Sequence, residues 1–488
     1  MGPSVDTGAV VSDALARLDH LLVSGGDERQ VLDAAGYNRF HVRPRTEGVV
    51  LRRGSCTGSS LTPLATRSLS SALADASTTW PSSESYEELR RELATLLALD
   101  DDVAIVFAPC GTDVCYVPLL IESLIEPERP VLNLVTRTDE IGRGCIAAHA
   151  GKHHSSRTQL GTAQVGSPVA PRLHVEVCPI SAREPDGQPR DPWPTILQTI
   201  HTSGPGHRVL VSLVDCSKSG LRDSLDEVGN LIECDAVWSL DACQLRLTTE
   251  SINDALRRGG YVFITGSKFF EAPPFCGACL VPEWAHERLR DARTRPEAIE
   301  GFRSIFSMFD LPETFGPRRL FRRTVNEGLL VRWRAAILEF EALATWKQSE
   351  VDDAIAGWHR AVSGALLDHG FRLLPTTDRS SRSIVSFTTE RADGVLTLQH
   401  AQSLHRVVNR SSNLMGGVDA VQIGQPLVSN GEAVLRLALG SSGLRSLLAS
   451  GGRHDADLAL VEMLSKLIDQ VSQNRSHDPS GAIGLPLD

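Results

Sequence analysis

Two residues between positions 236 and 282 could do chemistry together, an aspartate and a lysine. Asp241 ends the apolar run AVWSLD, and Lys268 follows the apolar run YVFIT after Gly266 and Ser267. A lysine amine can form a Schiff base with an aldehyde, and a carboxylate can stabilise a positive charge beside it. Each residue alone is more typical of a surface lysine or a turn cap, whereas the ordered set favours a ligand site.

The elements around these residues predict how they would meet. The two apolar runs are typical of buried strands, and the segment ESINDALRRGG between them is helix-like. A strand, helix and strand in succession form a parallel pair, so both strand ends point to the same edge of the sheet. Ligands bind at that edge in open α/β sheets, and we therefore expect Asp241 and Lys268 in one crevice.

The motifs in this stretch resemble those of pyridoxal-phosphate (PLP) enzymes of fold type I, in the class V aminotransferase and cysteine desulfurase branch. The matching residues are Asp241-Ala-Cys-Gln244 and then Thr265-Gly-Ser267-Lys268, followed by the strand CGACLVP. The resemblance implies that Lys268 carries PLP as a Schiff base and that Asp241 keeps the pyridine nitrogen protonated. It also implies that Gln244 donates to the ring oxygen and that Ser267 or Thr265 binds the phosphate.

Further site residues follow from the same resemblance. Gly111 and Thr112 lie in a small-residue turn between a strand and a helix, which suits phosphate binding, although Cys110 stands where a serine is common. Ser217, or its neighbour Cys216, corresponds to an asparagine that meets the cofactor ring oxygen. The residue that stacks on the ring stays open among five candidates: Asp139, Glu140, His149, His153 and His154.

Arg436 interrupts the apolar run VLRLALG near the end of the chain. In relatives of this branch a strand arginine binds the α-carboxylate of the substrate, and a planar guanidinium suits that task. An arginine within an apolar strand is costly unless it is paired, which fits such a role. The alternative is an arginine on an edge strand that faces water.

The alternation of strands and helices from 104 to 281 predicts an α/β fold with a doubly wound, mostly parallel sheet. With the resemblance, this becomes fold type I, with a large PLP-binding domain and a small C-terminal α/β domain. We expect an N-terminal arm and helix at 1–80, the large domain at 81–325 and the small domain at 326–474. A disordered tail would follow at 475–488. The stretch at 54–61 could cross to a partner subunit and line the site.

Composition narrows the classes of partner. The chain has 488 residues, 41% of them hydrophobic, and a net charge of −11 without a long basic run, so neither nucleic acid nor an anionic membrane is expected. Because we find no long apolar run and no signal segment, we expect a cytoplasmic protein. All ten cysteines lie between 56 and 279 and are expected to be reduced. Cys276 and Cys279 lack a second pair, so no metal is expected.

The expected function is the transformation of an α-amino acid through an external aldimine and a Cα carbanion, and a homodimer is expected by analogy. Formation or cleavage of a carbon–carbon bond, as in decarboxylases and aldolases of specialised biosynthesis, ranks first. Class V transamination and β- or γ-replacement are the alternatives, and a non-catalytic PLP-binding protein is a remote one. Cysteine desulfurization is rejected because no cysteine follows 279 and Ser267 replaces the histidine before the lysine.

Overall fold

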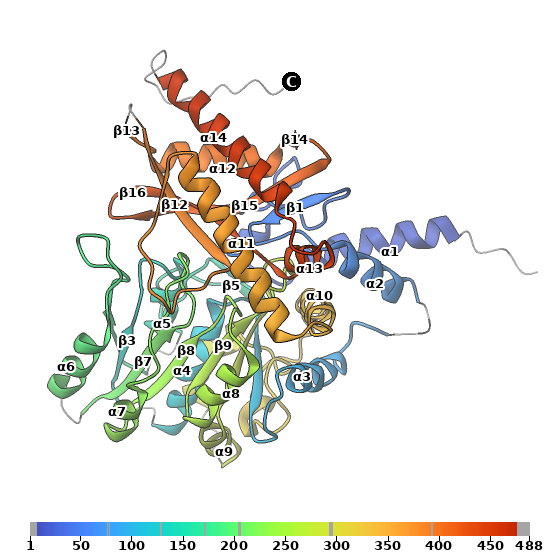
Figure 1. Cartoon of the computed structure of the whole chain (residues 1–488). Coiled ribbons are helices and arrows are strands. Elements are labelled where there is room, and N and C mark those ends of the chain that lie inside the picture. Colours follow the sequence, from blue (N-terminus) through green and yellow to red (C-terminus); the bar gives the residue numbers. More distant parts are fainter. Residues whose placement is uncertain are drawn as a thin grey trace, which may run out of the picture.

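The computed structural model in Figure 1 describes residues 7–75, 77, 79–126, 129–169, 172–203, 206–291, 296–391 and 394–475. The tail predicted to be disordered, 475–488, lies outside the described residues apart from residue 475.

The first large sheet has seven strands, and its topology confirms the predicted fold class. Every neighbouring pair is parallel except those of β10, which runs antiparallel to both of its neighbours. The strand order is β2 (Ala104–Ala108), β10 (Gly277–Val281), β9 (Tyr261–Thr265), β8 (Val237–Asp241), β7 (Arg208–Val214), β3 (Val131–Val135) and β6 (Val175–Pro179).

Helices cover both faces of this sheet because its strands are apolar on both sides. Along β2, Val106 packs into one core and Phe107 into the other. The Val106 core includes α4 (Tyr116–Ile125), α5 (Cys145–His149) and α9 (Glu283–Asp291). The Phe107 core includes α3 (Ser85–Leu96), α6 (Trp193–Ser203), α7 (Val228–Glu233), α8 (Thr249–Arg257) and α10 (Glu327–Leu343).

The second large sheet combines the two ends of the chain. Its main path runs β1 (Val50–Arg53), β15 (Val418–Ser429), β16 (Glu432–Ala438), β12 (Ile384–Arg391) and β11 (Phe371–Leu373). β13 (Gly394–Val395) and β14 (Ser412–Met415) are attached to it, and a separate hairpin is formed by β4 (Arg157–Thr158) and β5 (Gly161–Thr162). β1 pairs in parallel with β15, so the N-terminal segment completes the C-terminal sheet. The predicted boundaries at 80, 325 and 474 stay predictions.

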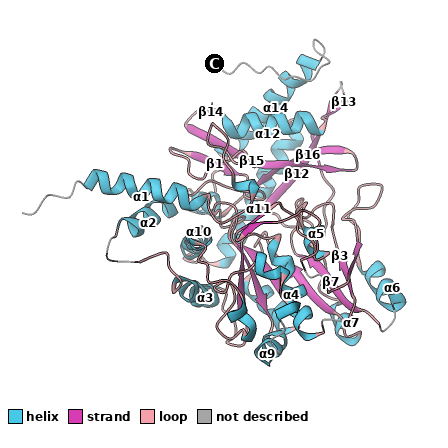
Figure 2. Cartoon of the chain, turned by 180° about the vertical axis from the view of Figure 1, so that it is seen from behind, coloured by secondary structure: helices cyan, strands magenta, loops and turns pink. Residues whose placement is uncertain are grey.

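The remaining helices pack around the two sheets. They are α1 (Thr7–Leu22), α2 (Pro63–Ala74), α11 (Gln348–Asp368), α12 (Leu398–Arg410), α13 (Ser441–Ala449) and α14 (Asp455–Arg475). Ala14, Leu18 and Leu21 form the buried stripe of α1, at the spacing of one helix face. In Figure 2 the start of α1 projects from the body of the molecule. Within the described ranges, no helix has both the length and the apolar composition that a bilayer crossing requires.

Candidate active site

Asp241 and Lys268 lie on neighbouring parallel strands at one edge of the first sheet. Asp241 is the last residue of β8, and Lys268 follows the end of β9 in the turn that leads to β10. The Asp241 carboxylate accepts a hydrogen bond from the backbone N–H of Cys243 at 3.0 Å. Burial raises the pKa of this carboxyl, and the nearby positive charge of Lys268 partly offsets the increase. The positive charge of Lys268 therefore acts on a desolvated Asp241 carboxyl.

The Lys268 amine faces the N-terminal segment of the same chain. Its Nζ donates a hydrogen bond to the backbone carbonyl of Thr57. Burial lowers the pKa of Lys268 to about 8, and the positive charges of Arg436 and Arg29 act in the same direction. An amine with this pKa is partly neutral near pH 7, as a nucleophilic lysine requires.

The predicted phosphate turn lies against the ends of the same two strands. A Cβ atom on Gly111 would come within 2.9 Å of Thr265 Cγ2 and 3.0 Å of Cys243 Sγ, so only glycine allows this approach. The Thr265 hydroxyl donates to the carbonyl of Cys243 at 2.6 Å, and the Ser267 hydroxyl donates to Thr265 Oγ1 at 3.4 Å. Thr112 is buried directly before the short helical turn that opens α4. These four predicted residues are thus brought together.

Gln244 joins the same region but is bound to the N-terminal segment. Its Nε2 donates to the carbonyl of Cys56 at 3.1 Å, and its Oε1 accepts from Arg246 at 3.3 Å. Arg246 also donates to the carbonyl of Leu439 at 2.7 Å and to Ser55 at 2.7 Å. Gln244 and Arg246 therefore connect the end of β8 to both the N-terminal segment and the second sheet.

Arg436 lies on β16, between β15 and β12, so the alternative of an arginine on a water-facing edge strand is excluded. The residue is 3% exposed. Its guanidinium donates to the carbonyls of Gln425 at 2.9 Å and Lys218 at 3.0 Å, and to the Thr57 hydroxyl at 3.2 Å. Thr57 consequently contacts both Lys268 and Arg436, which brings the predicted carboxylate arginine to the lysine.

Ser217 belongs to a separate buried network. Its hydroxyl donates to one carboxylate oxygen of Glu140 and accepts from the Leu221 N–H at 3.1 Å. The other carboxylate oxygen of Glu140 accepts from Arg183 at 2.8 Å. The Ser217 hydroxyl is therefore already bound within this network.

The candidates for the ring-stacking residue have partners elsewhere. Asp139 accepts from the N–H of Ala182 at 2.7 Å, and the carbonyl of His149 accepts from the Asn133 side chain at 3.0 Å. Glu140 pairs with Arg183, and His154 pairs with Asp113. His153 is buried, and no hydrogen bond joins it to Lys268 among the described residues. The structure identifies none of them as the stacking residue.

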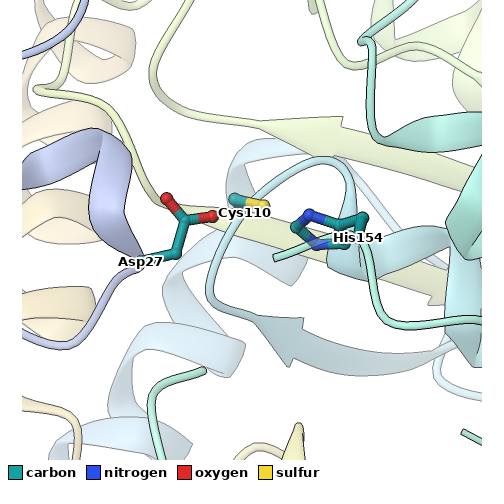
Figure 3. A group of neighbouring side chains, drawn as sticks. All are labelled: Asp27, Cys110 and His154. Carbon is teal, nitrogen blue, oxygen red and sulfur yellow. The ribbon is translucent and has the colours of Figure 1, made fainter. Parts of the chain in front are cut away.

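A second polar cluster lies beside the phosphate turn. Figure 3 shows Asp27, Cys110 and His154 converging from three segments, with ligand atoms within 4.8 Å of one another, as a metal site would need. However, the Arg29 guanidinium donates to Asp27 at 2.6 Å and to Cys110 at 3.2 Å. Since this cation already occupies the acidic side of the cluster, we expect no metal there.

Asp113 completes this cluster from the start of α4. It accepts from His154 at 2.9 Å and from the Cys110 thiol at 3.1 Å. Burial opposes the charge of His154, but its hydrogen bonds to Asp113 and Cys110 raise its pKa to about 11. His154 is therefore an imidazolium paired with Asp113, which fixes the turn that carries Gly111.

Two contacts at the site could not be found from the sequence. Thr57 binds Lys268 through a backbone carbonyl, which has no residue signature, although the stretch 54–61 was expected to line a site. That stretch reaches the lysine of its own chain. The second contact is the hydrogen bond from Arg436 to the backbone carbonyl of Lys218. Lys218 follows β7 beside Ser217, and its position in that turn is the one sign in the sequence that it could lie near the site.

Known structures share this architecture, although neither the family models nor the curated proteins searched include a match to the sequence. An alanine–glyoxylate aminotransferase from Nostoc sp. is similar with a TM-score of 0.56 and 15% identity, covering 87% of this chain and 97% of that chain. A NifS-like protein from Rickettsia africae gives 0.55 and 11%, covering 86% and 99%. A cysteine desulfurase from Escherichia coli gives 0.52 and 14%, covering 88% and 95%.

These identities are low, so the likeness concerns the fold. It extends over nearly the full length of each neighbour and over most of this chain. The chain thus has the fold of these aminotransferase and desulfurase structures, which agrees with the fold expected from the resemblance.

Proposed function

We propose that this chain is a PLP-dependent enzyme that transforms an α-amino acid at its Cα atom. The observation that carries the proposal is that Asp241 and Lys268 follow the ends of neighbouring parallel strands, and that Thr57 binds both Lys268 and Arg436. An amine, a carboxylate and a guanidinium are the groups that an aldehyde cofactor, its ring nitrogen and a substrate carboxylate require.

The residues present fit the cofactor. Asp241 is a desolvated carboxylate whose pKa is raised by burial, so a protonated ring nitrogen would be a favourable partner. Gly111 allows a close backbone approach beside Thr265, and Thr112, Thr265 and Ser267 add hydroxyl donors for a phosphate. Lys268 would hold the cofactor covalently. We leave Ser217 out of the proposed site because Glu140 binds its hydroxyl.

Pyridoxal phosphate, when bound, supplies an electron sink for an attached amino acid. Lys268, once released from the cofactor, would accept or return the proton at the substrate Cα. Its pKa of about 8 suits that exchange near neutral pH. The guanidinium of Arg436 now binds two carbonyls and a hydroxyl, and a carboxylate would be a stronger, charge-assisted acceptor.

The type of reaction has two candidates. The sequence motifs favour carbon–carbon bond formation or cleavage, whereas the names of similar structures, such as the alanine–glyoxylate aminotransferase, favour transamination. Incubation with an amino acid and a keto acid separates them. Transamination yields a new amino acid, while carbon–carbon cleavage releases carbon dioxide or an aldehyde. Persulfide chemistry is not proposed, because the sequence has no cysteine after 279.

We also propose a homodimer, because fold type I sites commonly form between two subunits. Light scattering of the purified protein would test this. A monomer that binds PLP would contradict it.

The cofactor assignment is tested by the absorption spectrum of the purified protein from about 300 to 500 nm. We expect a band near about 410–430 nm that borohydride bleaches. Lys268→Ala should lack the band, and Lys466→Ala, at an exposed lysine of α14, should retain it. Absence of the band after PLP is added to the wild-type protein would overturn the proposal. A band without turnover of any amino acid would favour a non-catalytic PLP-binding protein.

A further inference from the structure

The lysines of this chain divide into two groups. The sequence has only five, at 152, 218, 268, 347 and 466. Lys152, Lys347 and Lys466 are exposed, whereas Lys218 and Lys268 are both largely covered. Both covered lysines lie in turns that follow strands of the first sheet, at the edge where the candidate site forms. A lysine seldom gives up its hydration without a partner or a function.

Lys218 and Lys268 lie on either side of Arg436. The backbone carbonyl of Lys218 accepts from the Arg436 guanidinium at 3.0 Å. Thr57 joins the same guanidinium to Lys268, since its hydroxyl accepts from Arg436 at 3.2 Å and its carbonyl accepts from the lysine amine. The guanidinium of Arg436 thus links three cationic residues, since it binds the backbone of Lys218 directly and Lys268 through Thr57.

The charges of Lys218 and Arg436 are only partly compensated, since Glu140 acts on Lys218 without an ion pair. The Lys218 amine donates to the carbonyl of Ile141, and no ion pair of Lys218 or Arg436 is found among the described residues. The nearest acid, Glu140, is bound by Arg183 at 2.8 Å and by the hydroxyls of Ser217 and Ser219. Burial lowers the pKa of Lys218 to about 8, and repulsion from Arg436 and Arg143 adds to this.

The proposed function accounts for two of the three cations. Lys268 is committed to the cofactor, and Arg436 to the α-carboxylate of the substrate. The cofactor phosphate has its own donors at the Gly111 turn. Lys218 is left over, and its amine donates to the carbonyl of Ile141, in the segment that leads to Cys145, whose thiol donates to Thr112 at 3.9 Å.

We propose that Lys218 selects substrates with a second anionic group, so that the enzyme acts on acidic amino acids. Arg436 would bind the α-carboxylate, and the Lys218 ammonium would bind a side-chain carboxylate or phosphate. This inference rests on the proposed function for the orientation of the substrate. It differs from a purely structural role, in which Lys218 would only hold the Ile141 carbonyl.

The test measures ligand binding by the shift of the cofactor band in the full-length, PLP-loaded protein. L-aspartate, L-glutamate and O-phospho-L-serine are compared with L-alanine and L-norvaline. We expect at least one acidic amino acid to bind about tenfold to a hundredfold more tightly than the neutral ones, the effect of one charge-assisted hydrogen bond. The phosphoserine arm distinguishes a phosphate from a carboxylate. Equal affinity of the wild-type protein for all five amino acids would by itself overturn the inference.

Substitution then locates the effect. Lys218→Met should remove the preference, measured as the ratio of the affinities for the acidic amino acid and for L-norvaline, and Lys218→Arg should restore part of that ratio. Lys466→Met, on the exposed face of α14, is the matched control. Retention of the full preference in Lys218→Met would overturn the inference.

A second readout needs no cofactor. Succinate and glutarate should raise the melting temperature of the cofactor-free protein more than butyrate does, and Lys218→Met should abolish the difference. If the wild-type protein forms no cofactor band but keeps this dicarboxylate selectivity, the proposed function fails and the anion site stands. If the band forms and the selectivity is absent, the inference about Lys218 fails alone.

Discussion

The acidity of the Lys268 amine predicts how fast the chain should bind an aldehyde. Burial lowers the pKa of Lys268 to about 8. At pH 7 an amine of that pKa is about 9% neutral, whereas an unperturbed lysine is about 0.03% neutral. Since only the neutral amine attacks a carbonyl, we expect attachment of PLP to be about 300-fold faster at pH 7 than an unperturbed lysine allows.

The assay mixes cofactor-free protein with PLP by stopped flow and follows the lysine-bound cofactor between about pH 6.5 and 10. The rate should rise about tenfold per pH unit up to about pH 8 and then level off. Nα-acetyl-lysine, measured in parallel, corrects for the ionisation of PLP itself. Arg436→Met should move the midpoint to higher pH, because the charge of Arg436 contributes to the lowered pKa.

The reasoning would be refuted by a rate that keeps rising to pH 10 as it does for the reference amine. Such a profile would mean that water reaches Lys268 and that the crevice does not desolvate it. If the midpoint lies near pH 8 and Arg436→Met does not move it, burial alone lowers the pKa of Lys268 and the charge of Arg436 does not contribute.

Three other changes give further checks. Gly111→Ala should cost about 1–3 kcal/mol of stability through overpacking against Thr265, and should weaken PLP binding; an unchanged PLP titration would contradict the placement of the phosphate turn. Asp113→Asn should cost about 3–5 kcal/mol in urea unfolding, because it leaves the His154 imidazolium unpaired. The contribution of His154 is complete below the ordinary histidine pKa of 6.5 and is lost progressively as the pH rises from there to about 11, so a difference that stays constant over this interval would disprove the pairing. Lys268→Met should stabilise the cofactor-free protein at pH 7, because folding lowers the pKa of this lysine and so disfavours its charged form. The gain in stability should vanish as the pH rises from about 8 to the unfolded pKa, and a gain that grows over this interval would contradict a lowered pKa.

The sequence predicted the parts of the site that depend on strand ends. Asp241 and Lys268 follow apolar runs in a strand–helix–strand unit, and parallel pairing of β8 and β9 brings their ends together. Gly111 was predicted for the same reason, since β2 also ends at this edge. These contacts follow from local pattern and topology.

Contacts between distant segments could not be predicted in this way. The Thr57 carbonyl meets Lys268 because β1 pairs with β15, a pairing across most of the chain that has no local pattern. Ser217 was expected beside the cofactor, but Glu140 lies close enough to bind its hydroxyl. The apolar run around Arg436 is compatible with an edge strand, and the pairing of β16 with a strand on each side excludes this.

The parallel pairing of β1 with β15 has a consequence for synthesis on the ribosome. Val50 pairs with Ala420, so the partner of β1 emerges only after most of the chain has been made. Until then the segment that supplies Thr57 has no strand beside it, and contacts of such sequence separation form slowly. The surroundings of Lys268 are therefore among the last parts of the molecule to assemble, and a nascent chain released before residue 420 would have Lys268 without the segment that covers it.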